Sequence, residues 1–266
     1  RALRPARVDL MWPREHGAYG QVSFPLVTAF AVAGASLGGL CVAATVLAGL
    51  FAHEPAAILL GARGSRARRD AGPLAWRWLV TTIVLGVIAG GVALRALSPP
   101  ARWSLLLPAG LATILLVAML RQREKTWYGE IAAALAFSTA AVPVVLAAGR
   151  PVHEAGAVAL PYALLFVTTT LAVRVVILRV RGGGDPRGAA ATRQAALTLA
   201  VLSLAGLTGG AVAGVLGWPV LLTSAPGLLT ATALALRPPP PTRLRAMGWT
   251  LVAVTALTAV LIIATT

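Results

Sequence analysis

A histidine and a carboxylate stand next to each other inside an apolar segment, and this pair is the strongest candidate for chemistry in the chain. The stretch FAHEPAAILLGARGSRARRD (51–70) begins in an apolar run, and its polar part opens at Gly61. His53 and Glu54 lie about two helical turns before that glycine. Ionisable groups at such a depth are unfavourable in a membrane unless they are paired or face a polar cavity. We therefore predict that His53 and Glu54 are catalytic residues.

The chemistry that this pair can support is proton transfer. His53 can act as general acid or base, and Glu54 can orient the imidazole or bind one metal ion. Pro55 removes a backbone hydrogen bond from its helix, and a kink there can open a polar pocket. The alternative is a buried pair that neighbouring helices satisfy, without a catalytic role.

Basic residues follow the pair at spacings that suit an anion. Gly61-Ala62-Arg63-Gly64 and Arg66 can hold a phosphate-like group with backbone N–H groups and guanidinium groups. Arg63 and Arg66 are therefore predicted to bind substrate, although the glycine–arginine pattern is common.

Three further polar clusters are candidates for the same site. PREHGAYG (13–20) places Glu15 and His16 at the start of an apolar segment, where they can be catalytic or simply mark a helix start. RQREKTWYGE (121–130) contains the predicted substrate-binding residues Arg123, Lys125 and Glu130, or forms a solvated loop beside an aromatic belt.

Arg174 and Arg181 lie seven residues apart and share a face if one helix includes both. They are predicted to face inward and bind an anionic ligand. The alternative is that Arg174 extends to the membrane surface, as long basic side chains do.

The composition is that of a membrane protein. The chain has 266 residues, of which 58% are hydrophobic and 12% charged, whereas a soluble domain has about 25% charged residues. The net charge of +15 does not predict nucleic-acid binding, because the arginines stand at the ends of apolar segments rather than on a basic face with interleaved aromatics. The single cysteine excludes an internal disulfide and a cysteine-based zinc site. The sequence identifies no cofactor or metal ligand set.

Apolar segments of about 20 residues predict the membrane-spanning elements. We predict one all-α transmembrane domain over residues 1–266, a polytopic bundle of about nine helices. The predicted spans are 17–35, 39–60, 76–97, 103–120, 129–148, 157–180, 194–213, 216–236 and 246–264. Two of the breaks are weakly marked, AGASLGG (33–39) and the stretch with Gly214, Gly217 and Pro219, so seven or eight helices are the alternative to nine.

The positions of the charges agree with that count. With a cytoplasmic N-terminus and nine spans, the connections on the outer side contain only Arg95, Arg102 and Arg150 of the 23 basic residues. Such asymmetry follows the positive-inside rule and predicts a C-terminus outside. Every carboxylate except Glu154 also falls at or near the inner face, which indicates either a polar site there or ordinary pairing with arginine.

The motifs PREHGAYG, HEP (53–55) and REKTWYGE (123–130) resemble the YwiC-like family of bacterial integral membrane proteins. The family pattern has Trp where this chain has Tyr19. The resemblance, which we expect over most of the chain, implies a multi-pass protein of the bacterial cytoplasmic (inner) membrane and carries no established activity.

A more distant resemblance is to the UbiA-type intramembrane prenyltransferases, which have about nine helices and polar motifs in cytoplasmic loops. Their first motif, Asn-Asp-x-x-Asp-x-x-x-Asp, would place Ala57 and Gly61 at positions of metal-binding aspartates. Their second aspartate motif would fall in the basic stretch 174–181. This chain therefore departs from magnesium diphosphate chemistry at two sites, because a hard cation needs several oxygen ligands.

Three functions agree with these observations. The first is a UbiA-like enzyme, or a degenerate relative, that binds an isoprenoid or lipid-like substrate with an anionic head group and has a prenyltransferase-like activity if it is catalytic. The second is a transporter or proton-coupled carrier, and the third is a non-catalytic accessory subunit. The lipid bilayer is the one partner that the composition itself implies.

Overall fold

The apolar segments form helices in the computed structural model, which describes residues 11–12, 16–123, 126–180 and 186–266. No strand occurs within those ranges. The helices in chain order are α1 (His16–Ala33), α2 (Leu37–Leu59), α3 (Ser65–Ala96), α4 (Pro99–Ser104), α5 (Leu106–Leu120), α6 (Trp127–Thr139), α7 (Ala141–Ala147), α8 (Val152–Val180), α9 (Pro186–Val212), α10 (Trp218–Leu236), the short 3₁₀ helix η2 (Pro241–Arg243) and α11 (Leu244–Thr265).

Nine apolar segments cross the bundle in the part of the chain that the structure describes. Eight are long and apolar enough to span a membrane, and α1 is a slightly shorter ninth. Two crossings consist of two helices in succession, α4 with α5 and α6 with α7. The prediction of an all-helical polytopic bundle is confirmed, including both weakly marked breaks, after Ala33 and after Val212.

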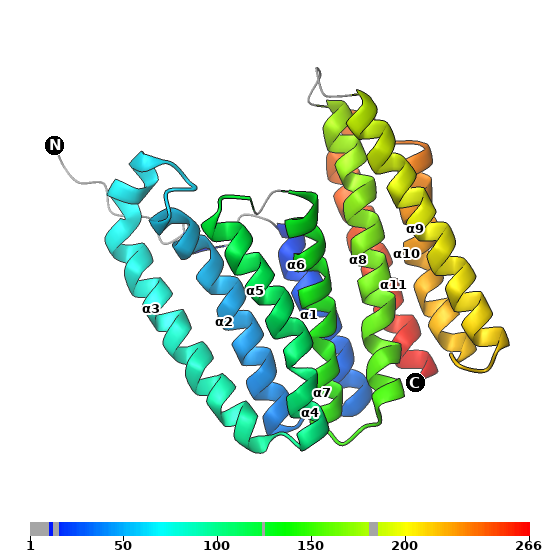
Figure 1. The fold of residues 1–266 in the computed structure, drawn as a ribbon, viewed down its shortest axis with the longest axis horizontal. Coiled ribbons are helices and arrows are strands. Elements are labelled where there is room, and N and C mark those ends of the chain that lie inside the picture. Colours follow the sequence, from blue (N-terminus) through cyan, green and yellow to red (C-terminus); the bar gives the residue numbers. More distant parts are fainter. Residues whose placement is uncertain (1–10, 13–15, 124–125, 181–185) are drawn as a thin grey trace.

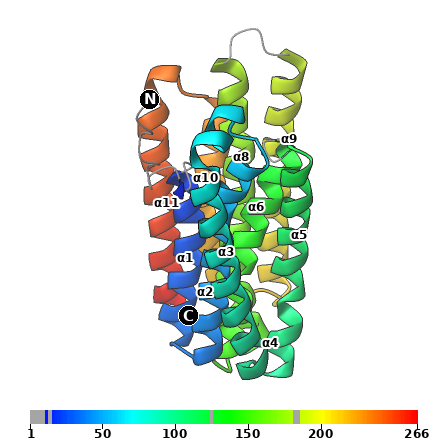
Figure 2. The ribbon, with the colours of Figure 1, turned by 90° about the vertical axis from the view of Figure 1, so that its left-hand side faces the viewer.

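The centre of the bundle consists of α1, α6, α7 and α8 (Figure 1). The α2–α3 pair lies on one side and α9 with α10 on the other, while α11 packs on α1, α8 and α10. Figure 2, viewed from the side of α3, shows the long axes of these helices nearly aligned. One continuous apolar core extends from Val22 to Ile262. Within it the hydroxyls of Thr28 and Tyr162 share a hydrogen bond of 2.6 Å.

Helices α8 and α10 come very close to each other at a glycine. A β-carbon built on Gly227 would lie 2.7 Å from Leu165 Cδ1 and 3.2 Å from Leu165 Cα. Only a residue without a side chain fits there, and small residues allow such close contact between membrane helices.

Three helices begin at least five residues before their predicted spans. The predicted third span starts at 76, yet α3 starts at Ser65 and contains 32 residues, or about 48 Å. A hydrocarbon core is only about 30 Å thick. The arginine cluster that follows Gly64 therefore belongs to a helical extension rather than to a loop, and α8 and α9 also begin earlier than predicted, at Val152 and Pro186.

Candidate functional site

Glu54 and Arg63 form a buried ion pair at the end of α2. Arg63 Nε donates to Glu54 Oε1 at 2.8 Å, and Arg63 Nη2 donates to Oε2 at 2.6 Å. The Glu54 side chain is fully buried and that of Arg63 is 13% exposed. This two-bond geometry is the strongest form of arginine–carboxylate contact, and it offsets the desolvation of both charges.

A tight turn brings Arg63 back over Glu54. After α2 ends at Leu59, backbone bonds from Gly61 N to Ile58 O (3.0 Å) and from Ala62 N to Ala57 O (2.9 Å) reverse the chain. Gly64 has φ +89° and ψ 159°, a conformation essentially confined to glycine, and α3 begins at the next residue. The first turn of α3 therefore lies directly beside the ion pair.

Aromatic residues surround this end of α2. The Phe51 ring lies edge-on to Trp12, with centroids 5.5 Å apart, and 6.4 Å from the ring of Tyr19. Met11 is buried with Ile58 and Ala71 on the α2–α3 pair. His53 is half-buried. In the sequence it lies two residues after Phe51 and directly before Glu54. Sequence analysis missed Trp12 and Phe51, for which no signal beyond their aromatic character exists.

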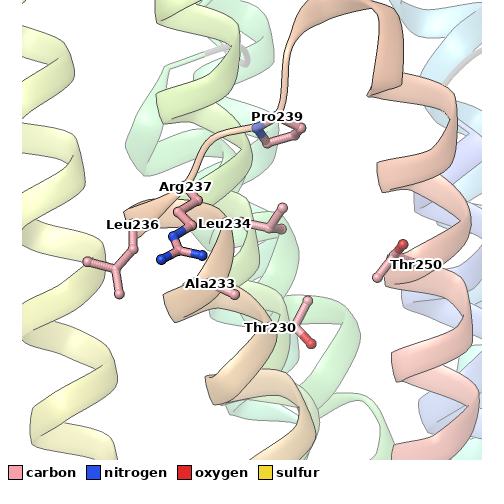
Figure 3. Close-up of a pocket in the computed structure, with 7 residues that line it drawn as sticks. All are labelled: Thr230, Ala233, Leu234, Leu236, Arg237, Pro239 and Thr250. Atoms are coloured by element: carbon pink, nitrogen blue, oxygen red, sulfur yellow. The ribbon is translucent and has the colours of Figure 1, made fainter.

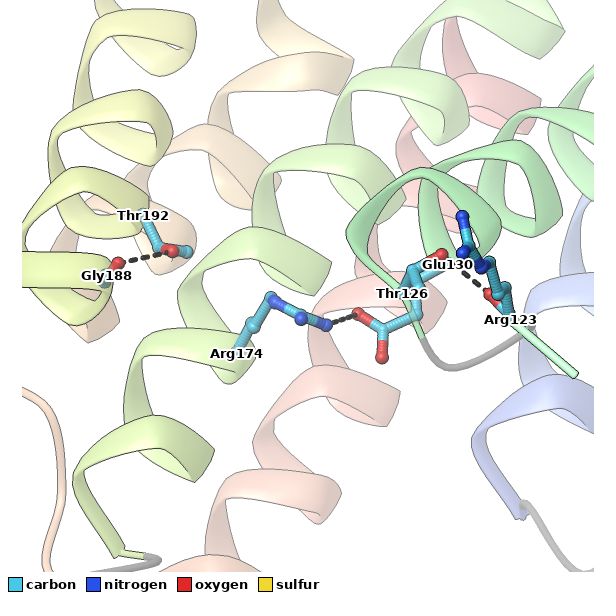
Figure 4. A network of polar contacts seen from close by, with 6 residues as sticks. All are labelled: Arg123, Thr126, Glu130, Arg174, Gly188 and Thr192. Atoms are coloured by element: carbon cyan, nitrogen blue, oxygen red, sulfur yellow. Dashed lines mark hydrogen bonds and ion pairs between the residues drawn. The ribbon is translucent and has the colours of Figure 1, made fainter. Parts of the chain in front are cut away.

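A second ion pair joins α6 to α8. Arg174 Nη1 donates to Glu130 Oε2 at 3.0 Å, and the two side chains are 25% and 35% exposed (Figure 4). Arg174 therefore extends sideways to a neighbouring helix. Near it, the exposed Arg123 contributes its backbone carbonyl to a hydrogen bond from Thr126 Oγ1, and Thr192 Oγ1 donates to Gly188 O on α9.

The remaining predicted site residues are exposed or undescribed. Arg66 lies in the first turn of α3, 91% exposed, with its Nε 3.6 Å from Asp70 Oδ2. His16 begins α1, but its side chain is not among those that the structure describes. Glu15, Lys125 and Arg181 also lie outside the described residues.

The Glu54–Arg63 and Glu130–Arg174 pairs lie on different helices, so these predicted residues form two polar clusters. Among the described residues, no three His, Cys, Asp or Glu side chains are placed to hold a metal ion. A further ion pair, Arg150 Nε to Glu154 Oε2 at 2.9 Å, lies at the opposite end of the bundle, and its i, i+4 spacing in the sequence is typical of such a contact within one helix.

These observations define a multi-pass helical membrane protein with ion pairs near one end of its bundle. The model of the YwiC-like protein family matches residues 12–145, and the chain belongs to this family. The matched part contains HEP and REKTWYGE, and it ends in α7, which is a shorter match than we expected. No curated protein and no solved structure matches the chain, and no comparison confirms the resemblance to the UbiA-type enzymes.

Proposed function

We propose that this YwiC-like protein binds an isoprenoid or other lipid-like molecule by its anionic head group, at the end of the bundle where the α2–α3 turn lies. This end would face the cytoplasm of a bacterial inner membrane. The observation that supports the proposal is the Glu54–Arg63 pair, which joins the turn before α3 to the residue that follows His53 in α2. A fully buried carboxylate is unfavourable within a membrane unless it is paired, and ionisable residues at such positions commonly serve a function.

The geometry supports distinct roles for the two partners. Because Arg63 is engaged by both oxygens of Glu54, we assign the pair a positioning role rather than direct contact with substrate. The head group would bind at the first turn of α3, where Gly64 provides no side-chain cap and Arg66 is exposed. Backbone N–H groups at a helix start and a nearby guanidinium are a favourable combination for an anion.

His53 would carry out proton transfer on the bound molecule. It follows the aromatic Phe51 and directly precedes the buried carboxylate, so its ring lies near the end of the apolar part of α2. The Glu130–Arg174 pair, partly exposed between α6 and α8, would supply a second polar contact. If the molecule is transformed, the reaction class is a prenyltransferase-like transfer.

Native mass spectrometry of the protein extracted with its lipids tests the proposal. We expect the wild type to retain a lipid-like anion, Arg66→Ala to lose most of it, and His53→Ala to retain it with an altered set of bound species. Arg95→Ala, an exposed arginine at the other end of α3, is the matched control. Equal retention in the Arg66 and Arg95 variants would disprove the proposed head-group site.

A proton-coupled carrier is the second candidate, because the carboxylate of Glu54 is fully buried in a helix that spans the bundle. Proton flux into vesicles that contain the purified protein distinguishes it. Flux that depends on Glu54 and His53, without a retained lipid, would favour the carrier over the enzyme.

A further inference from the structure

An open cavity of about 590 Å³ lies between the end of α10 and the facing part of α11. Figure 3 shows Thr250 on α11 across from Thr230 of α10, while Leu236 points toward the side of α9. None of the residues predicted to form the polar site belongs to it. The lining residues are Thr230, Ala233, Leu234, Leu236, Arg237, Pro239 and Thr250.

The walls of this cavity suit a hydrocarbon chain. Ala233, Leu234 and Leu236 line it from α10, and the exposed large side chains of Leu229 and Trp249 lie on the same two helices. Such surfaces face the acyl chains of a bilayer, since lipid is the apolar solvent for membrane helices. The volume is within the range of about 300–1,000 Å³ that small-molecule sites occupy.

A basic side chain, that of Arg237, lies at the end of the apolar wall. Arg237 is the residue after α10, is exposed, and lines the cavity together with the apolar residues. Arg243, the last residue of η2, and Arg245, in the first turn of α11, are also exposed. The sequence has no acidic residue after Asp185, so this region contains no carboxylate of its own to neutralise the arginines.

The connection between the helices keeps the cavity open. Residues 238–241 are four consecutive prolines, which favour a stiff extended chain and have no backbone N–H. This connection ends in the short helix η2, and Pro239 itself lines the cavity. The ends of α10 and α11 are therefore held apart by a spacer rather than by side chains that fill the space.

We infer that the groove between α10 and α11 binds one anionic phospholipid, with an acyl chain along Ala233 and Leu234 and the phosphate at Arg237. Basic residues near the membrane surface attract anionic lipid, and an apolar groove beneath them selects for the attached chain. This site goes beyond the proposed function, because its residues are separate from both ion pairs.

Delipidated protein in detergent, mixed with phosphatidylglycerol or phosphatidylcholine, tests the inference by native mass spectrometry. The wild type should retain one phosphatidylglycerol in preference to phosphatidylcholine. Arg237→Ala should weaken retention of phosphatidylglycerol roughly fivefold, as expected for the loss of one basic contact. Ala233→Phe, an exposed position whose larger side chain would fill the groove, should reduce retention of both lipids.

Two controls separate this site from the polar site. Arg121→Ala removes an exposed arginine beyond the end of α5, and we expect it to retain phosphatidylglycerol like the wild type. Arg66→Ala removes the arginine of the proposed head-group site, and a loss of phosphatidylglycerol in this variant but not in Arg237→Ala would overturn the inference. Equal retention of the two lipids by the wild type, or unchanged retention in both groove variants, would overturn the inference.

Discussion

At the scale of single residues, the most demanding feature is the charge pair of Glu54 and Arg63. Sequence analysis identified both residues but assigned them independent roles, since a nine-residue separation gives no regular helical contact. Their contact depends on the reversal at Gly61, which returns the chain over the end of α2. Similarly, no pattern in the sequence connects Arg174 to Glu130, because 44 residues separate them.

Removing one partner of the buried pair should destabilise the fold far more than removing an exposed arginine nearby. Arg63→Ala leaves the carboxylate of Glu54 buried without this partner, and such losses are about 3–5 kcal/mol. Arg66→Ala breaks only the exposed contact to Asp70, worth about 0–1 kcal/mol. The free energy of unfolding in micelles measures both, and similar values for the two variants would contradict a buried, strongly paired Glu54.

At the scale of elements, the turn between α2 and α3 brings Arg63 to Glu54. The predicted loop after Gly61 proved to be much shorter, because charge alone does not end a helix that extends past the hydrocarbon. Hydropathy detects the limits of the apolar layer, whereas the helix itself continues as long as its backbone hydrogen bonds are satisfied.

Gly64→Ala should strain this turn. At φ +89° and ψ 159° a β-carbon is unfavourable, and we expect a loss of about 1–3 kcal/mol in stability, with looser packing of Arg63 on Glu54. Gly72→Ala, inside α3 where an added β-carbon would meet nothing within 4 Å, is the matched control and should be neutral or slightly stabilising. Thermal unfolding of both variants checks the prediction, which is wrong if Gly64→Ala unfolds at the temperature of the wild type.

Gly227→Ala should separate α8 from α10. The new methyl would meet the side chain and backbone of Leu165, and we expect about 1–3 kcal/mol of destabilisation. Gly206→Ala, on α9 with nothing within 4 Å, should have little effect. Comparable unfolding curves for the two variants would contradict this prediction, because they would show that α8 and α10 can move apart without a loss of stability.

At the scale of the whole molecule, hydropathy and charge predicted the number and order of the crossings. They did so because the membrane imposes two independent signals on the sequence. Its thickness sets the length of the apolar segments, and its two sides differ in the basic residues that their connections contain. The arrangement of the helices around α6, α7 and α8 had no such signal. It depends on small residues and on individual contacts, such as Gly227 with Leu165, that only the folded chain reveals.

The orientation in the membrane can be measured directly. In a Cys41→Ala background, Ser98→Cys should react with a membrane-impermeant thiol reagent on intact bacterial cells, because the connection between α3 and α4 would lie outside. Arg121→Cys, exposed at the opposite end, should react only after the cells are permeabilised. The reverse pattern would place the arginine-rich end outside and contradict the positive-inside assignment.

The hydrogen bond between Thr28 and Tyr162 has a consequence for how the protein is made. Tyr162 belongs to α8, beyond the family match, yet it is completely buried in the core. Chains are synthesised from the N-terminus, so α1 to α7 enter the membrane before their central neighbour exists. Until α8 is inserted, the surfaces of α1, α6 and α7 that later pack on it contact lipid or the insertion machinery. A nascent chain released before α8 would therefore be an incomplete bundle and a target for quality-control proteolysis.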